Sequence, residues 1–210
     1  MISVTQILET FPEKELVEWK LRVGPVKAKQ VSEEAKHIGS ATDLKVQADC
    51  KGLPQDTFET LSSVEKVAVE SCWQGWQKFK ADHPDFLPSL TGIQQELVQG
   101  EYIGHPDFLL KREGWFGVVD LKCASQIRPS HWTQVAAYSW LKDSEHNALS
   151  LAILRLDKTT GGYEYVELTD PDQINYEVQV WLNYKVLYEH RQRVAERSRT
   201  MREDAVLYEP

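Results

Sequence analysis

Two short stretches contain the side chains best suited to catalysis, namely Gly104-His-Pro-Asp107 and Val118-Val-Asp-Leu-Lys122. Side chains two positions apart on a β-strand point to the same face of a sheet. Asp120 and Lys122 therefore share a face if the second stretch is a strand, and Leu121 between them points into the core. A carboxylate and an ammonium group held side by side can bind a metal ion and act on a phosphate.

The first stretch supplies a second carboxylate, Asp107, whose position depends on the hairpin between the two stretches. If residues 113–114 are a two-residue loop, Arg112 pairs with Trp115. The same register then places Asp107 opposite Asp120, with Cβ atoms ~4.5–5.5 Å apart. A loop longer or shorter by one residue would remove this direct pairing.

Two carboxylates that face each other repel, and a hard divalent cation turns that repulsion into binding. Mg²⁺ commonly takes one or two carboxylates together with water and phosphate oxygens. Lys122 beside the metal can orient or deprotonate an attacking water and stabilise charge on a phosphate, which suits phosphodiester hydrolysis. Glu96, on an extended stretch before Asp107, can join the metal shell or hold a metal-bound water. The ordinary alternative is a solvated sheet face in which Asp107, Asp120 and Lys122 form a salt bridge.

A helix is expected over residues 131–141, directly after the second stretch. Gln134 and Tyr138 lie four residues apart and so share a face of this helix. Gln134 can then bind a phosphate or the nucleophilic water. In the alternative interpretation the helix is simply amphipathic, with Tyr138 packed in the core and Gln134 exposed. Arg128 and His131 lie at the helix N-terminus, where main-chain N–H groups favour phosphate, and are candidates for contacts with a nucleic-acid backbone.

The tetrapeptide His-Pro-Asp-Phe occurs twice, at residues 83–86 and 105–108. The first copy follows a helical pattern, lies among prolines and has no Asp-x-Lys sequence a hairpin away. It is therefore predicted to be a loop without a catalytic role.

The elements that must position these residues are predicted from hydrophobic periodicity. Ser3 or Thr5 can cap a first short helix, and Leu16, Val17 and Trp19 are expected to face inward from the second. The clearest helical pattern has apolar residues at every third or fourth position from Phe58 to Phe79, including Val64. Helices are expected over residues 4–12, 13–23, 30–50, 57–80, 131–141 and from Pro171 onward, with a charged end, 197–210, that frays. Extended segments are expected at residues 93–110, 115–121, 148–156 and 163–168.

This order of elements predicts an α/β (α+β) fold with a central mixed β-sheet flanked by helices. The chain is expected to be a single domain, 1–210. A helical N-terminal part, 1–88, precedes a catalytic sheet core, 90–170, and a C-terminal helix and tail, 171–210.

Composition excludes several classes of protein. The 24 basic and 32 acidic residues give a formal net charge of −8, and the hydrophobic share of 41% is that of a globular protein. The sequence contains no run of ~18 apolar residues that could span a membrane, and residues 1–10 do not resemble a secretory signal. A cytoplasmic location is therefore expected. The acidic balance argues against coating nucleic acid by bulk charge, but not against a local metal site. Three widely spaced cysteines disfavour a disulfide framework or a four-thiolate metal site.

In chain order, the candidate residues resemble the motifs of the PD-(D/E)XK nuclease superfamily, and most of all its RecB-like exonuclease branch, which has phage-encoded members. The pieces that carry this resemblance are Glu96, Pro106-Asp107, Asp120-Leu-Lys122 and Gln134-Val-Ala-Ala-Tyr138. They span about a fifth of the chain. The resemblance implies a restriction-endonuclease-like core, one or two Mg²⁺ or Mn²⁺ ions, and cleavage of DNA, commonly from an end.

The resemblance also assigns roles to individual residues. Lys122 would be the catalytic lysine and Gln134 the accessory residue, and the metal ligands would be Asp107, Asp120, Glu96 and the Leu121 carbonyl. Many RecB-like members have an upstream Gly-[Ser/Thr]-x-x-His sequence, where this chain has Gly39-Ser-Ala-Thr-Asp43. Asp43 can replace that histidine as an oxygen ligand of the metal. Alternatively, this part of the set of metal ligands is altered in the present chain.

The sequence thus predicts a Mg²⁺- or Mn²⁺-dependent DNA exonuclease of phage or cellular recombination, repair or DNA processing. Its expected substrate is linear DNA, single- or double-stranded, contacted by Arg128, His131 and Tyr138. A recombination or single-strand-binding protein is a candidate partner, and no membrane partner is expected. The alternatives are a structure-specific endonuclease with the same site, and a non-catalytic DNA- or partner-binding module that retains the fold.

Overall fold

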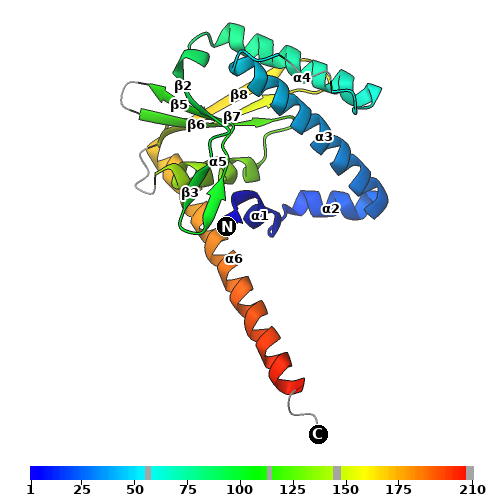
Figure 1. Cartoon of the computed structure of the whole chain (residues 1–210), viewed down its shortest axis with the longest axis vertical. Coiled ribbons are helices and arrows are strands. Elements are labelled where there is room, and N and C mark those ends of the chain that lie inside the picture. The colour runs from blue at the N-terminus through cyan, green and yellow to red at the C-terminus, as the bar shows by residue number, and fades with distance from the viewer. Residues whose placement is uncertain (55–57, 113–114, 144–147, 207–210) are drawn as a thin grey trace.

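The structure is a computed structural model that describes residues 1–54, 58–112, 115–143 and 148–206 (Figure 1). Its helical elements form an N-terminal group, one helix between strands, and a long C-terminal helix. They are α1 (Val4–Glu9), α2 (Lys14–Val23), α3 (Pro25–Cys50), α4 (Ser63–Asp82), the 3₁₀ helix η1 (Leu87–Ser89), α5 (Pro129–Lys142) and α6 (Pro171–Val206).

The strands form two mixed sheets. The larger has the order β2-β5-β6-β7-β8 and is antiparallel except for the parallel pair β6 and β7; the smaller has the order β1-β4-β3. The strands are β1 (Ile2–Ser3), β2 (Leu90–Ile93), β3 (Leu97–Gln99), β4 (Tyr102–Gly104), β5 (Phe108–Arg112), β6 (Trp115–Lys122), β7 (Ala148–Leu156) and β8 (Tyr163–Leu168). The predicted α/β class, a central mixed sheet flanked by helices with a restriction-endonuclease-like order, is confirmed.

The hairpin of β5 and β6 has the predicted register. Arg112 pairs with Trp115, and the pairing continues without a shift to Phe108 opposite Val119. Asp107 lies directly before β5, outside this ladder, and its carboxylate accepts a hydrogen bond from the Leu121 main-chain N–H of β6. Residues 113–114, predicted to be the loop, lie outside the described residues.

Alternating residues of β6 face two different helical layers. Val118 packs into the cluster that contains α5 and α6 residues, whereas Val119 and Leu121 pack into the cluster that contains Trp76 of α4. By this period of two, Asp120 and Lys122 lie on the α5 face, and Leu121 points into the core as predicted. The sheet therefore presents its polar pair toward the helix that carries Gln134.

Several predicted boundaries are wrong. The fourth helix begins at Ser63 rather than near Thr57, because Ser62 and Glu65 form a capping box that fixes its start. Phe58 has φ 49°, which no helix accommodates, and Val64 is 65% exposed on the outer face. The third helix begins at Pro25 rather than at 30, because proline is suited to a first helical position.

The two ends of the chain also differ from expectation. Ile2 and Ser3 form a strand beside β4, which the sequence did not reveal. Val17 of α2 is exposed rather than inward-facing. Helix α6 continues to Val206 instead of fraying after Arg197. Within the described part of the chain, no helix has the length and hydropathy needed to cross a bilayer.

Candidate active site

A pocket of about 550 Å³ lies where the ends of β5 and β6 meet helices α1, α3 and α5. Its wall combines the hairpin residues singled out in the sequence with one face of α3. The lining residues are Thr5, Ala35, Lys36, Gly39, Ser40, Asp43, Gln94, His105, Asp107, Asp120, Leu121, Lys122, Cys123, Ala124, Gln134 and Tyr138.

Asp107 is held by two donors on opposite sides of its carboxylate. Its Oδ2 accepts a hydrogen bond from the Leu121 main-chain N–H at 2.5 Å, and its Oδ1 accepts one from the Gln94 side chain. Burial, followed by the nearby charges of Asp120 and Asp43, raises the pKa of Asp107 well above its usual range. Ionisation of this carboxyl group therefore destabilises the folded protein unless a cation balances its negative charge.

Asp120 and Lys122 form the ion pair at the centre of the pocket. Lys122 Nζ lies 2.5 Å from Asp120 Oδ2, and Asp120 is only 2% exposed. Asp120 Oδ2 therefore has Lys122 as its partner in an ion pair and no further hydrogen bond among the described residues. Burial favours a lower pKa for Lys122, but Asp120 and Asp107 outweigh it and leave that pKa raised. Lys122 is therefore an ammonium cation in the metal-free protein.

Gln134 of α5 connects this ion pair to the helical layer. Its Oε1 accepts a hydrogen bond from Lys122 Nζ at 2.9 Å, and its Nε2 donates to the Tyr138 hydroxyl at 2.8 Å. The predicted shared face of Gln134 and Tyr138 is thus observed. Tyr138 is only 5% exposed, and burial together with Asp120 raises the pKa of its hydroxyl.

Tyr138 is closely packed, although its side chain also lines the pocket. The ring packs against Gly104, where an added Cβ would lie 2.7 Å from Tyr138 Cε1. Only glycine at position 104 allows this close approach. Tyr138 therefore holds Gln134 in position from within the core.

Asp43 of α3 reaches the same pocket from the opposite wall. Its Oδ2 accepts hydrogen bonds from Gln47 at 2.8 Å and Gln94 at 3.4 Å, while its Oδ1 is buried without a hydrogen-bond partner within the described residues. Burial, opposed in part by the Gln47 hydrogen bond, raises the pKa of Asp43, and the charge of Asp120 adds to the rise. The structure therefore brings Asp43 to the hairpin carboxylates.

Glu96 is not among the residues that line the pocket, although its neighbour His105 is. It lies in the connection between β2 and β3, its side chain is 59% exposed, and its carboxylate is 3.5 Å from His105 Nε2. Gln94 has φ 50°, which ends β2 and turns its amide toward Asp107. Two residues later, Glu96 faces solvent.

Arg128 and His131 lie at the N-terminus of α5, outside the pocket lining. The His131 Nδ1 accepts a hydrogen bond from the Arg128 main-chain N–H at 3.2 Å. Burial lowers the pKa of His131 to about 4, with the charge of Lys122 adding to the effect. His131 is neutral at neutral pH, so it cannot attract phosphate by charge.

Sequence reasoning missed the contribution of Gln94 and of the α3 wall. Lys36, Ser40 and Asp43 are spaced by four and three residues, which places them on one helix face. That spacing was visible in the sequence, but its direction toward the hairpin depends on how α3 packs. No sequence signal distinguishes Gln94 from other glutamines in loops.

The oxygen donors of the pocket fit a hard divalent cation. Asp43, Asp107 and Asp120 bring three carboxylates to the pocket beside the half-buried Lys122. Asp43 Oδ1 is buried without a hydrogen bond among the described residues, whereas Asp120 Oδ2 is paired with Lys122. Among the residues described, no three His, Cys, Asp or Glu side chains already enclose a point that could hold a metal. Carboxylate oxygens are the kind of ligand that hard divalent cations prefer.

Comparisons with known proteins do not establish a family. No protein-family model matches the chain, and no curated protein matches it. Among solved structures, it is similar to the alkaline exonuclease LHK-Exo from Laribacter hongkongensis, with 10% identity, a TM-score of 0.41 and 93% of each chain covered. It is also similar to LHK-Exo in complex with dAMP, with 10% identity, a TM-score of 0.40 and 93% of each chain covered. A structure named SSO0001 has 12% identity and a TM-score of 0.38 over 89% of this chain and 75% of the other. Likeness at this level does not establish a shared activity.

Proposed function

We propose that the chain is a Mg²⁺- or Mn²⁺-dependent deoxyribonuclease of the PD-(D/E)XK type, and specifically a RecB-like exonuclease acting on the ends of linear DNA. One observation carries the proposal. The β5–β6 register directs Asp107, Asp120 and Lys122 into one pocket, together with Gln134. A buried group with an excess of carboxylates is costly unless a cation joins it, and phosphodiester hydrolysis uses such a cation.

The oxygens of Asp107, Asp120 and Asp43, with the Leu121 carbonyl, would hold the ion. When bound, Mg²⁺ or Mn²⁺ would supply positive charge to the scissile phosphate and a lowered pKa to a coordinated water. Glu96, at the His105 contact, is assigned no ligand role in this proposal.

The remaining residues would act on the phosphate. Lys122, as an ammonium cation, would orient the attacking water and stabilise charge that develops on the phosphate oxygens. Gln134 fixes the direction of the Lys122 side chain through its 2.9 Å hydrogen bond. The Arg128 side chain is proposed to bind the DNA backbone.

The experiment compares linear and covalently closed circular DNA in the presence of Mg²⁺, Mn²⁺ or EDTA. Cleavage of linear DNA alone, dependent on the metal, supports the exonuclease. Cutting of closed circles favours the endonuclease with the same site. No cleavage with any metal, while DNA still binds, favours a non-catalytic binding module.

The sequence offers a matched control for the active-site variant. Asp107→Asn and Asp85→Asn change the same residue in the same tetrapeptide, but Asp85 is exposed and outside the pocket. Asp107→Asn should abolish cleavage, and Asp85→Asn should leave it unchanged. Lys122→Ala tests the proposed cation, and full activity in that variant would refute the catalytic assignment.

A further inference from the structure

Lys36 of α3 is a cation of the active-site pocket to which the proposed mechanism assigns no role. Lys36 and Lys122 are both among the residues that line this pocket. Lys122 is paired with Asp120 and donates to Gln134. Lys36 is exposed, and its ammonium group has no hydrogen bond or ion pair with another residue of the described chain. Lys36 is therefore available to an anion that enters the pocket.

Lys36 lies on the same face of α3 as the carboxylate of Asp43. Lys36, Ser40 and Asp43 are spaced by four and three residues, and the exposed Ser40 lies between the other two. Lys36 precedes Asp43 by seven residues, which is ~10 Å along the helix axis. Asp43 and Asp107 both accept a hydrogen bond from Gln94. A line of polar groups thus leads from the carboxylates of the pocket to Lys36.

Gly39 interrupts this face near the middle of α3, a helix of 26 residues. Glycine disfavours a helix relative to alanine. The φ of Gly39 is not positive, and no heavy atom outside the adjacent turns of α3 lies within 4 Å of the position that a Cβ would take. Neither the backbone nor the packing therefore requires glycine, and such a break in local preference is expected at functional sites. The missing side chain leaves open space beside Lys36 and Ser40.

The charge of the pocket gives this space a use in binding DNA. Three carboxylates, those of Asp43, Asp107 and Asp120, line the pocket with Lys122. A divalent ion bound to them would attract the scissile phosphate, but the next phosphate of the same strand brings another negative charge toward the carboxylates. Lys36 is placed to balance the charge of that second phosphate through a charge-assisted hydrogen bond.

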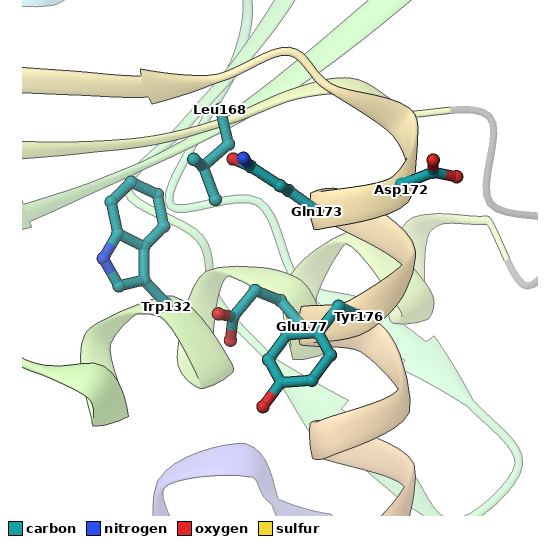
Figure 2. Close-up of a pocket in the computed structure, with 6 residues that line it drawn as sticks. All are labelled: Trp132, Leu168, Asp172, Gln173, Tyr176 and Glu177. Carbon is teal, nitrogen blue, oxygen red and sulfur yellow. The ribbon is translucent and has the colours of Figure 1, made fainter.

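A pocket between α5 and α6 does not fit the same ligand (Figure 2). It has a volume of about 400 Å³ and is lined by Trp132, Leu168, Asp172, Gln173, Tyr176 and Glu177. The charged members of this lining, Asp172 and Glu177, are both acidic and would repel a phosphate. Of the two pockets, only the one at α3 offers a phosphate an unpaired cation from the described chain.

We propose that Lys36, Gly39 and Ser40 form a subsite for the phosphodiester next to the scissile one in the bound DNA strand. The Lys36 ammonium and the Ser40 hydroxyl would donate hydrogen bonds to its non-bridging oxygens, and the strand would cross α3 at Gly39. The subsite rests on the proposed function, because it positions the strand for cleavage at the carboxylates. Lys36 is thus a binding residue that contacts a phosphate which does not react.

Fluorescence anisotropy of a labelled oligonucleotide in EDTA measures the contact without relying on catalysis. Lys36→Gln should weaken binding several-fold at low salt and reduce the slope of log K against log salt by about 0.7–0.9, the value for one phosphate contact. Lys27→Gln is the matched control and should leave the slope unchanged. Lys27 is an exposed lysine of the same helix, nine residues earlier and so on the opposite face, outside the pocket lining.

A single neutral linkage locates the contact along the strand. Oligonucleotides with one methylphosphonate, either next to the scissile bond or several nucleotides away, are compared by kcat/KM with Mg²⁺. The adjacent neutral linkage should lower kcat/KM roughly tenfold for wild type and Lys27→Gln, with little further effect on Lys36→Gln. The distant linkage should affect all three proteins equally. Gly39→Ala should lower kcat/KM on unmodified DNA without lowering Tm, because its methyl group enters open space.

The outcomes separate the subsite from the activity itself. Equal losses from the adjacent neutral linkage in wild type and Lys36→Gln, or an unchanged salt slope in Lys36→Gln, would overturn the proposal. An effect of Lys36→Gln confined to DNA with a terminal monophosphate would also overturn it, because Lys36 would then bind the strand end. Absence of cleavage by wild type, with the Lys36 effect on binding intact, would refute the proposed function and still support the phosphate contact.

Discussion

Replacing Asp107 by asparagine removes one negative charge from the group formed with Asp120 and Asp43, while it keeps the size of the side chain and one acceptor oxygen. Burial and the neighbouring carboxylates raise the pKa of Asp107 in the folded protein. Its ionisation is therefore easier in the unfolded chain than in the folded one. Asp107→Asn should stabilise the metal-free protein even though it removes activity.

The expected gain follows from two opposing effects. Carboxylates opposite each other on paired strands, ~5 Å apart, repel by about 3 kcal/mol at an effective dielectric constant of ~20. Lys122 offsets part of this repulsion, and asparagine can accept from only one of the two donors, the Leu121 N–H and the Gln94 amide, that Asp107 accepts from. A net gain of about 1 kcal/mol in the free energy of unfolding corresponds to roughly 2–4 °C in Tm for a chain of this size.

The assay is thermal unfolding of wild type, Asp107→Asn and the control Asp85→Asn, first in EDTA across pH and then with Mg²⁺ or Mn²⁺. The penalty on wild type is absent below the ordinary aspartate pKa and complete above the raised pKa of Asp107. The advantage of Asp107→Asn should thus grow with rising pH, and Asp85→Asn should show none. Saturating metal should stabilise wild type and the control, but Asp107→Asn much less.

The reasoning about Asp107 has a clear refutation. If Asp107→Asn is less stable than wild type in EDTA at pH 8, the carboxylate contributes more through its hydrogen bonds than it costs through repulsion. If metal stabilises Asp107→Asn as much as wild type, the ion does not bind at this carboxylate.

Three further changes test other parts of the structure. Gln134→Ala should keep the fold but lower the cleavage rate about 10- to 100-fold with little change in KM, because Lys122 loses its 2.9 Å partner; steady-state kinetics checks this. Gly104→Ala should lower the free energy of unfolding by about 1–3 kcal/mol in urea titrations, since the new Cβ would lie 2.7 Å from the Tyr138 ring. Asp157→Ala should cost about 1–3 kcal/mol at pH 7, because the side chain of Asp157 accepts hydrogen bonds from the hydroxyl and main-chain N–H groups of the turn that follows. These bonds lower the pKa of Asp157, so their contribution is present above the ordinary aspartate pKa and is lost as the pH falls below it; the difference between variant and wild type should shrink in acid.

Much of the candidate site could be predicted because it depends on short-range geometry. The alternation of side chains along a strand, with a short hairpin connection, places Asp107, Asp120 and Lys122 on one face. The four-residue spacing of Gln134 and Tyr138 places both on one face of α5. The two copies of His-Pro-Asp-Phe could also be told apart from the sequence. Only the copy at residues 105–108 leads into a strand that pairs with the strand of Asp120.

Other features depended on contacts between residues far apart in the sequence. Whether Asp43 or Glu96 joins the pocket is decided by the packing of α3 and by the positive φ of Gln94, and neither follows from local pattern. The burial of Tyr138 depends on the close approach of Gly104. Local periodicity sets which residues share a face, but burial and charge balance arise only when separate elements pack together.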